Sequence, residues 1–171
     1  ENGFCVVSPV LLNRDTCFSY GVLPNQRTHR DWIYTPAFEM GRHPVGFEIQ
    51  KVLAAIDWCS SMGPADAKIA LAGYGEGGQI AMYSAAIDPR VDAVLVSGYY
   101  SPRERIWQEP LYRNIWGLLD EFGDAEIATM IAPRSLVVEY SGYPEWKRDV
   151  NNTGPGELVT PSFTEVSREF N

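Results

Sequence analysis

The chain has 171 residues, of which 45% are hydrophobic and 12% aromatic, and its formal net charge is −8 at neutral pH. This length and composition predict one globular domain with a sizeable core. The negative charge argues against a nucleic-acid partner, and no apolar stretch approaches the roughly 20 residues of a membrane span. The cysteines Cys5, Cys17 and Cys59 lack the spacing of a zinc site, and we expect Cys5 and Cys59 to be buried thiols.

The first third of the chain predicts a strand, a long connection and a helix. Residues 3–11, GFCVVSPVL, form a β-branched apolar run that is typical of a buried strand. Residues 13–43 are polar and aromatic without clear periodicity, and a loop of this length is usually functional or holds short helices. One helical turn is expected within 31–43. From Pro44 to Gly63 the apolar residues recur at helical spacing, which predicts a helix.

Strands and helices alternate in the rest of the chain. Apolar runs at 68–73, 91–98 and 134–142 predict three more buried strands, and the small-residue-rich stretch 77–88 predicts a helix. Short helices are expected at 115–122 and 124–133, a loop after Gly142, and another helix within TPSFTEVSREFN. Continuous apolar strands that alternate with helices indicate an α/β fold, with a parallel sheet and helices on both faces.

The stretch GYGEGG, residues 73–78, has two interpretations. Gly73, Gly75 and Gly78 fit the G-x-G-x-x-G fingerprint of dinucleotide-binding folds. Such folds place an acidic residue near the end of the next strand, whereas the run at 91–98 has its only acid, Asp92, at its start. The alternative is the G-x-S-x-G nucleophile elbow of serine hydrolases, with Gly75 in the place of the serine.

The elbow interpretation is the better one because a strand that turns sharply into a helix needs small residues around the tip. Gly73 and Gly77 are expected to meet this demand, and Gly78 is expected to let the helix pack closely on the strand. The backbone N–H of Glu76, the residue after the tip, would then point into an oxyanion hole. We expect neither a cofactor nor a metal ion.

Three stretches resemble a known family when they are taken in order. They are HRDWIYTPAFEMGRHPVGFEIQKVLAAIDW, KIALAGYGEGGQIAMYSAAIDPRVDAVLVSGYY and FGDAEIATMIAPRSLVVE. Together they resemble bacterial α/β-hydrolases of the dienelactone hydrolase and acetyl xylan esterase-like group, over most of residues 27–140. The resemblance implies an α/β-hydrolase sheet and the hydrolysis of carboxylic esters or lactones.

The catalytic triad that the resemblance implies is incomplete. That chemistry needs a nucleophile, an acid and a histidine, in this chain order. Gly75 has no side chain that can attack a substrate. Glu139 and Glu145 are the available carboxylates, of which Glu145 is the candidate acid, and the two histidines, His29 and His43, both lie upstream.

Other side chains are candidates for a substitute chemistry. The hydroxyl groups expected near strand carboxyl ends, where open α/β sheets bind ligands, are those of Ser8, Tyr74, Ser97 and Ser101. Glu76 is a candidate base for a water molecule, although residues in its place usually contact solvent or cap the helix. His29, Arg30 and Asp31 either line the cleft or are structural. An apolar or sugar-binding cleft and core packing both explain the aromatic residues Trp32, Tyr34, Phe38, Trp107, Tyr112 and Trp116.

We therefore expect residues 1–171 to form a single α/β-hydrolase-like domain within a larger polypeptide, without the N-terminal strands and the C-terminal strand and helix of the fold. The first hypothesis is a hydrolase-family protein with impaired catalysis, whose ligand is a small ester or a carbohydrate-derived molecule. The alternative is a non-catalytic binding or scaffolding module of a larger bacterial protein. A secreted and a periplasmic location are both compatible with the sequence.

Overall fold

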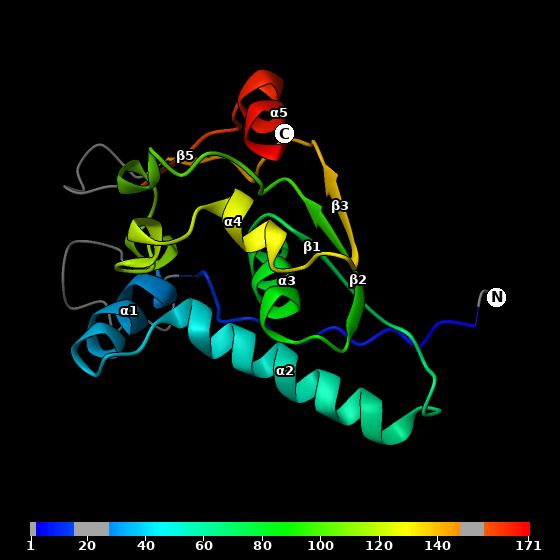
Figure 1. Cartoon of the computed structure of the whole chain (residues 1–171). Helices are drawn as coiled ribbons and strands as arrows, with labels where there is room; N and C mark the ends of the chain where they lie inside the picture. Colours follow the sequence, from blue (N-terminus) through cyan, green and yellow to red (C-terminus); the bar gives the residue numbers. More distant parts are fainter. Residues whose placement is uncertain (1–2, 16–27, 148–155) are drawn as a thin grey trace.

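A computed structural model of the chain describes residues 3–15, 28–147 and 156–171 (Figure 1). Its centre is a parallel sheet of β1 (Ile69–Tyr74), β2 (Val91–Ser97) and β3 (Ser135–Glu139), in that order across the sheet. Helix α3 (Glu76–Ile87) follows β1 and packs on β1 and β2. The α/β class and the parallel sheet are confirmed, and the predicted strand at 134–142 ends three residues early, at Glu139.

The remaining elements surround this sheet. They are helices α1 (His29–Glu39), α2 (Pro44–Met62), α4 (Asp124–Thr129) and α5 (Phe163–Phe170), the 3-10 turns η1 (Ile106–Gln108), η2 (Leu111–Arg113) and η3 (Leu118–Asp120), and the antiparallel pair β4 (Trp146–Lys147) and β5 (Glu157–Leu158). The single turn predicted within 31–43 is part of a longer, three-turn helix, α1, whose N-terminus is capped by the Thr28 hydroxyl. In place of the helix predicted at 115–122, the chain forms only the 3-10 turn η3 at Leu118–Asp120. The loop predicted after Gly142 holds β4, and its residues 148–155 lie outside the described part of the chain.

The main core has two parts, one between the sheet and α3 and one between α3 and α2. Figure 1 shows α3 between the sheet and the long helix α2. The buried face of α2 includes Val45, Val52 and Ile56, and it packs on α3, of which Ile80 and Met82 are almost fully buried. Burial of these side chains supplies the main favourable free energy of folding at this face.

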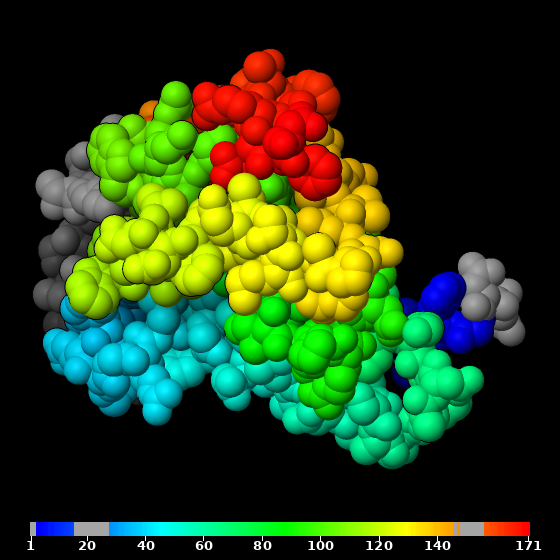
Figure 2. Space-filling model, in the orientation of Figure 1, coloured from blue at the N-terminus to red at the C-terminus, as the bar shows by residue number. Residues whose placement is uncertain are grey.

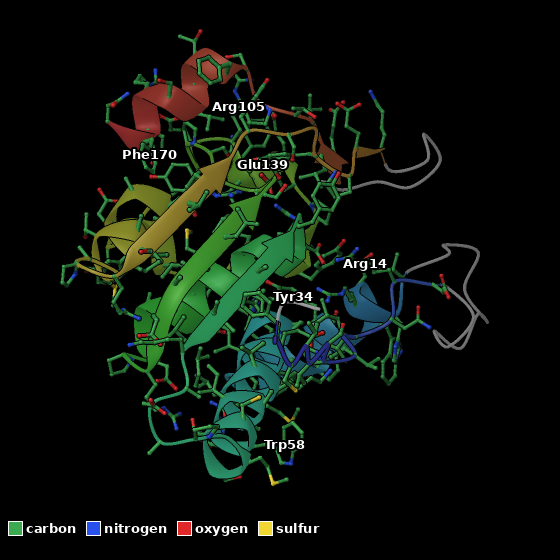
Figure 3. All side chains as sticks on the ribbon, turned by 90° about the vertical axis from the view of Figure 1, so that its right-hand side faces the viewer. Arg14, Tyr34, Trp58, Arg105, Glu139 and Phe170 are labelled. Atoms are coloured by element: carbon green, nitrogen blue, oxygen red, sulfur yellow. The ribbon has the colours of Figure 1, made fainter. Side chains whose placement is uncertain are left out.

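The opposite face of the sheet is exposed in the described part of the chain. Tyr74 of β1 is 54% exposed, Leu95 of β2 38% and Val137 of β3 56%, whereas Val96 of β2, on the other face, is fully buried. Figure 3 shows the three strands face on, with α3 behind them and no helix in front. Helices therefore cover one face within the described residues, where the sequence predicts both.

The N-terminal strand predicted at 3–11 is wrong. These residues are extended but pair with no strand among the described residues, and Phe4, Val6 and Val10 are each at least 85% exposed. Figure 2 shows the first described residues, in dark blue, at the edge of the molecule and away from its body. An apolar run becomes a strand only where a neighbouring strand accepts its backbone hydrogen bonds. For the same reason Cys5 is exposed, contrary to prediction, while Cys59 is half-buried and Cys17 lies outside the described residues.

Across the ranges that the structure describes, no helix has both the length and the apolar character that crossing a membrane requires.

Candidate functional site

The turn between β1 and α3 has the backbone geometry of a strand-to-helix elbow. Tyr74 ends β1, Glu76 begins α3, and Gly75 alone connects them with φ 56° and ψ −125°. A positive φ is unstrained for glycine and costs a residue with a Cβ free energy. The Gly75 N–H donates to the Ser97 carbonyl oxygen at 2.9 Å, which ties the buried tip to the end of β2. The elbow interpretation of residues 73–78 thus has the required backbone.

Two of the three glycines around the tip are closely packed, and Gly73 leaves no room for a side chain. A Cβ on Gly73 would lie 2.0 Å from the Gly77 carbonyl oxygen, and one on Gly78 would lie 3.2 Å from side-chain atoms of Val96 and Tyr99. The close packing predicted for Gly78 is confirmed. The steric demand predicted for Gly77 is wrong, because a Cβ there would have no heavy atom within 4 Å. The close contact at Gly77 involves its backbone, which packs against Gly73.

Glu76 contributes a backbone N–H at the start of a helix and a buried carboxylate. As the first residue of α3, it has an N–H that the helix leaves without an intrahelical acceptor, as the oxyanion-hole prediction requires. Its side chain is 6% exposed and forms ion pairs with Arg14 at 2.8 Å, Arg30 at 2.9 Å and Arg113 at 3.6 Å. Figure 3 shows Arg14 beside α1 and beyond the end of β1.

These arginines make Glu76 a poor candidate for a base. Burial alone would raise the pKa of Glu76, but the positive charges of Arg30, Arg113 and Arg14 outweigh it and hold that pKa below its ordinary value. A carboxylate with a lowered pKa binds a proton weakly, whereas a general base works best with a pKa near the operating pH. The contacts assign Glu76 a structural role, the same role as that of its partner Arg30.

The ion pairs of Glu76 continue through a buried network. It consists of the pairs Arg30–Glu48 at 3.1 Å, Arg113–Glu109 at 2.5 Å, Arg103–Glu109 at 3.2 Å and Arg103–Asp124 at 2.7 Å. The Leu12 N–H also donates to Glu48. The network thus joins the N-terminal segment, α1, α2, α3, η2 and α4 around the elbow. In the sequence its local signs include the i, i+4 pair Glu109 and Arg113 and the i, i+3 pair Glu48 and Lys51.

His43 has a structural role at the start of α2. Its Nδ1 accepts a hydrogen bond from the Val45 N–H at 3.2 Å, and its Nε2 lies 3.1 Å from the Asn114 carbonyl oxygen. Burial lowers the pKa of His43, although the hydrogen bond to Asn114 acts in the opposite direction. His29, the other histidine, begins α1 and stacks on Trp32 with ring centroids 6.4 Å apart.

The lowered pKa of His43 predicts that stability falls as the pH drops below the ordinary histidine value of 6.5. The unfolded chain binds the proton more tightly than the native protein, so the free energy of unfolding rises with pH in this range. His43→Asn keeps an N-cap acceptor without a titrating group. We expect it to flatten the pH dependence of urea unfolding between pH ~5 and ~7, with a small constant offset from the lost Asn114 contact. Parallel profiles for the variant and the wild type would contradict this role.

The segment after β3 lies against the tip of the elbow. A Cβ on Gly75 would be 2.9 Å from Cγ of Pro144, and the next residue is the candidate acid Glu145. The Glu145 carboxylate is exposed and accepts a hydrogen bond from the Thr160 hydroxyl at 2.9 Å. The candidate nucleophile position and the loop of the candidate acid therefore meet, and the acid role of Glu145 stays a prediction.

Three polar side chains gather at the carboxyl ends of β2 and β3. The Ser97 hydroxyl donates to Glu139 at 2.5 Å and lies 2.9 Å from the Ser141 hydroxyl. Figure 3 shows Glu139 at the end of β3. Of the other hydroxyl candidates, Ser101 is buried next to Asp124, and Ser8 lies in the exposed extended segment, not at a strand end.

The aromatic candidates do not form one group. Tyr112 is buried and stacks under the Arg30 guanidinium, whereas Trp32, Trp107 and Trp116 are 49%, 66% and 82% exposed. Arg30 and Asp31 are buried and so do not line an open cleft, which removes that option for both residues. In the residues that the structure covers, no group of three or more His, Cys, Asp or Glu side chains is placed to hold a metal ion.

The elbow region also carries a similarity to a known family. Residues 1–115 match the Dienelactone hydrolase family, and the matched range includes β1, the elbow, α3 and β2. No curated protein and no solved structure matches the chain. Because the family match spans more than half of the 171 residues and the elbow has the expected backbone, the chain belongs to the dienelactone hydrolase family of the α/β-hydrolase superfamily.

Proposed function

We propose that this chain keeps the hydrolase framework of its family without the covalent step of ester or lactone hydrolysis. The observation that carries the proposal is Gly75 at the tip of an otherwise intact elbow. Acyl transfer through this position needs a hydroxyl or thiol that attacks the carbonyl carbon, and glycine supplies neither. The position of the Glu76 N–H at the start of α3 supports the view that the hydrogen-bond donor for an oxyanion remains in a site that has lost its nucleophile.

The neighbouring side chains do not supply the missing chemistry. Glu76 is held as an anion by three arginines and does not act as a base on water. The Ser97 hydroxyl donates a hydrogen bond to the Glu139 carboxylate, and no histidine contacts it in the described residues. A serine is a weak nucleophile unless an adjacent general base, most often a histidine, takes its proton.

A second candidate function is a non-catalytic binding or scaffolding module. The buried ion network favours it, because it maintains the architecture around the elbow although no nucleophile is present. A ligand that binds only the native protein raises its unfolding temperature. A binding module is therefore expected to be stabilised by a lactone or an acetylated oligosaccharide, and a scaffold is expected to show no shift.

The absence of hydrolysis is tested by steady-state assays of the wild-type protein with p-nitrophenyl acetate and a small lactone. We expect turnover equal to that of the same concentration of heat-unfolded protein, which corrects for hydrolysis by exposed side chains. Saturable turnover by the native protein alone would contradict the proposed function.

A further inference from the structure

The elbow tip is covered by the chain's own segment 141–145, which we call the strap. Gly75 is buried, although in a catalytic elbow the tip must be open to a substrate. The nearest atoms to an added Gly75 Cβ are Cγ and Cδ of Pro144, at 2.9 and 3.1 Å. Carbon atoms at optimal separation are about 3.5–4.0 Å apart, so the proline ring already fills the volume that a side chain at position 75 would occupy.

Contacts along its whole length hold the strap in this position. The Tyr74 hydroxyl donates to the Gly142 carbonyl oxygen at 2.8 Å, and the Ser97 and Ser141 hydroxyls are 2.9 Å apart. The Tyr143 hydroxyl donates to the Tyr99 carbonyl oxygen. These contacts tie the strap to β1, to β2 and to the residues just after β2.

The Thr160 hydroxyl holds the far end of the strap from the other side. It accepts from the Tyr143 N–H and donates to the Glu145 carboxylate, both at 2.9 Å. Gly98 completes the fit, since it has φ +57° and an added Cβ would lie 3.0 Å from the Gly142 carbonyl oxygen. The strap is thus anchored on either side of Pro144, where a loose loop would have few such contacts.

We propose that the strap is a built-in plug, in which Pro144 takes the place of the nucleophile side chain and closes the elbow tip to small-molecule ligands. Gly75 and Pro144 form a complementary pair, because a residue with a Cβ at position 75 requires the ring to move. This inference rests on the proposed function, in which position 75 carries no nucleophile.

A double-mutant cycle between Gly75→Ala and Pro144→Gly tests the plug. With Pro144 present, the new methyl group meets both the positive φ and the ring, and we expect the folding equilibrium constant to drop by roughly a hundredfold or more. With Pro144→Gly only the backbone cost remains, and the expected drop is roughly tenfold. Urea unfolding of the four proteins measures the coupling between the two sites.

Pro64→Gly is the matched control, because Pro64 is exposed before β1, at the other end of the strand. Like Pro144→Gly, it increases the conformational freedom of the unfolded chain. Its effect on the free energy of unfolding is expected to add to that of Gly75→Ala. Gly75→Ala alone could fail to fold. In that case a folded double variant Gly75→Ala/Pro144→Gly supports the plug, and a double variant that also fails to fold overturns it. Additivity of Gly75→Ala with Pro144→Gly would also overturn the plug and leave the proposed function standing. Saturable ester turnover by the native wild type would overturn the proposed function, and the plug with it, because the plug rests on that function.

Discussion

Gly73→Ala is expected to lower the free energy of unfolding by more than about 3 kcal/mol, which places it among the most damaging single substitutions. Its Cβ would lie 2.0 Å from the Gly77 carbonyl oxygen and 2.1 Å from the Gly77 carbonyl carbon. Both are backbone atoms of α3, so the clash is relieved only if the helix moves away from β1. Chemical unfolding followed by circular dichroism measures the loss.

Gly77→Ala is the matched control for this substitution, four residues along the same turn. An added Cβ there meets nothing within 4 Å, and the residue lies inside α3. Alanine in place of a helical glycine is expected to stabilise the protein by about 0.5–1 kcal/mol. Equal effects of the two substitutions would mean that α3 does not pack on β1 as described.

Glu76→Gln is the second substitution with a large expected effect. It keeps the size of the side chain but leaves Arg30 and Arg113, which are 1% and 2% exposed, without this anionic partner. Breaking a buried ion pair by removal of one charge typically costs roughly 3–5 kcal/mol, and we expect a loss of this size in urea unfolding at neutral pH. Glu104→Gln is the control, because Glu104 and its partner Arg168 are 74% and 65% exposed. It is expected to leave the midpoint almost unchanged.

The same network predicts a distinct acid response. Because the native pKa of Glu76 lies below the ordinary value of 4.5, its charge stabilises the fold above that value, and this stabilisation is lost as the pH falls through the native pKa. Glu76→Gln lacks this contribution at every pH. The difference in stability between wild type and variant is therefore expected to shrink with acidification, and a difference that stays constant would contradict the ion-pair role.

The elements around the elbow were predictable because their signals are local. The apolar run at 68–73 ends in glycines and resumes as a helix, and β1, Gly75 and α3 follow this pattern within one or two residues. The start of α2 at Pro44 and the end of β2 beside Gly98 are equally local. Such boundaries are decided by steric effects and capping between residues close in the sequence, so they can be predicted from the sequence alone.

The strap contacts and the ion pairs of Glu76 were not predictable, because each joins residues that are far apart in the sequence. Tyr74 and Gly142, which hold the strap to β1, are 68 positions apart, and Glu76 and Arg14 are 62 apart. Neither pair has a local pattern. The strand expected at 3–11 failed for the same reason, since its formation depends on a neighbour that the run itself does not encode.

The most direct test of a closed, nucleophile-free elbow is intact-mass spectrometry of the wild-type protein, quenched in acid within seconds of mixing with p-nitrophenyl acetate. The structure predicts no burst of p-nitrophenol and no acetylated species above that of heat-unfolded protein, because Gly75 has no acceptor atom and Pro144 covers it. A stoichiometric burst with one acetyl group on the native protein, mapped to the elbow, to Ser97 or to the strap, would contradict it.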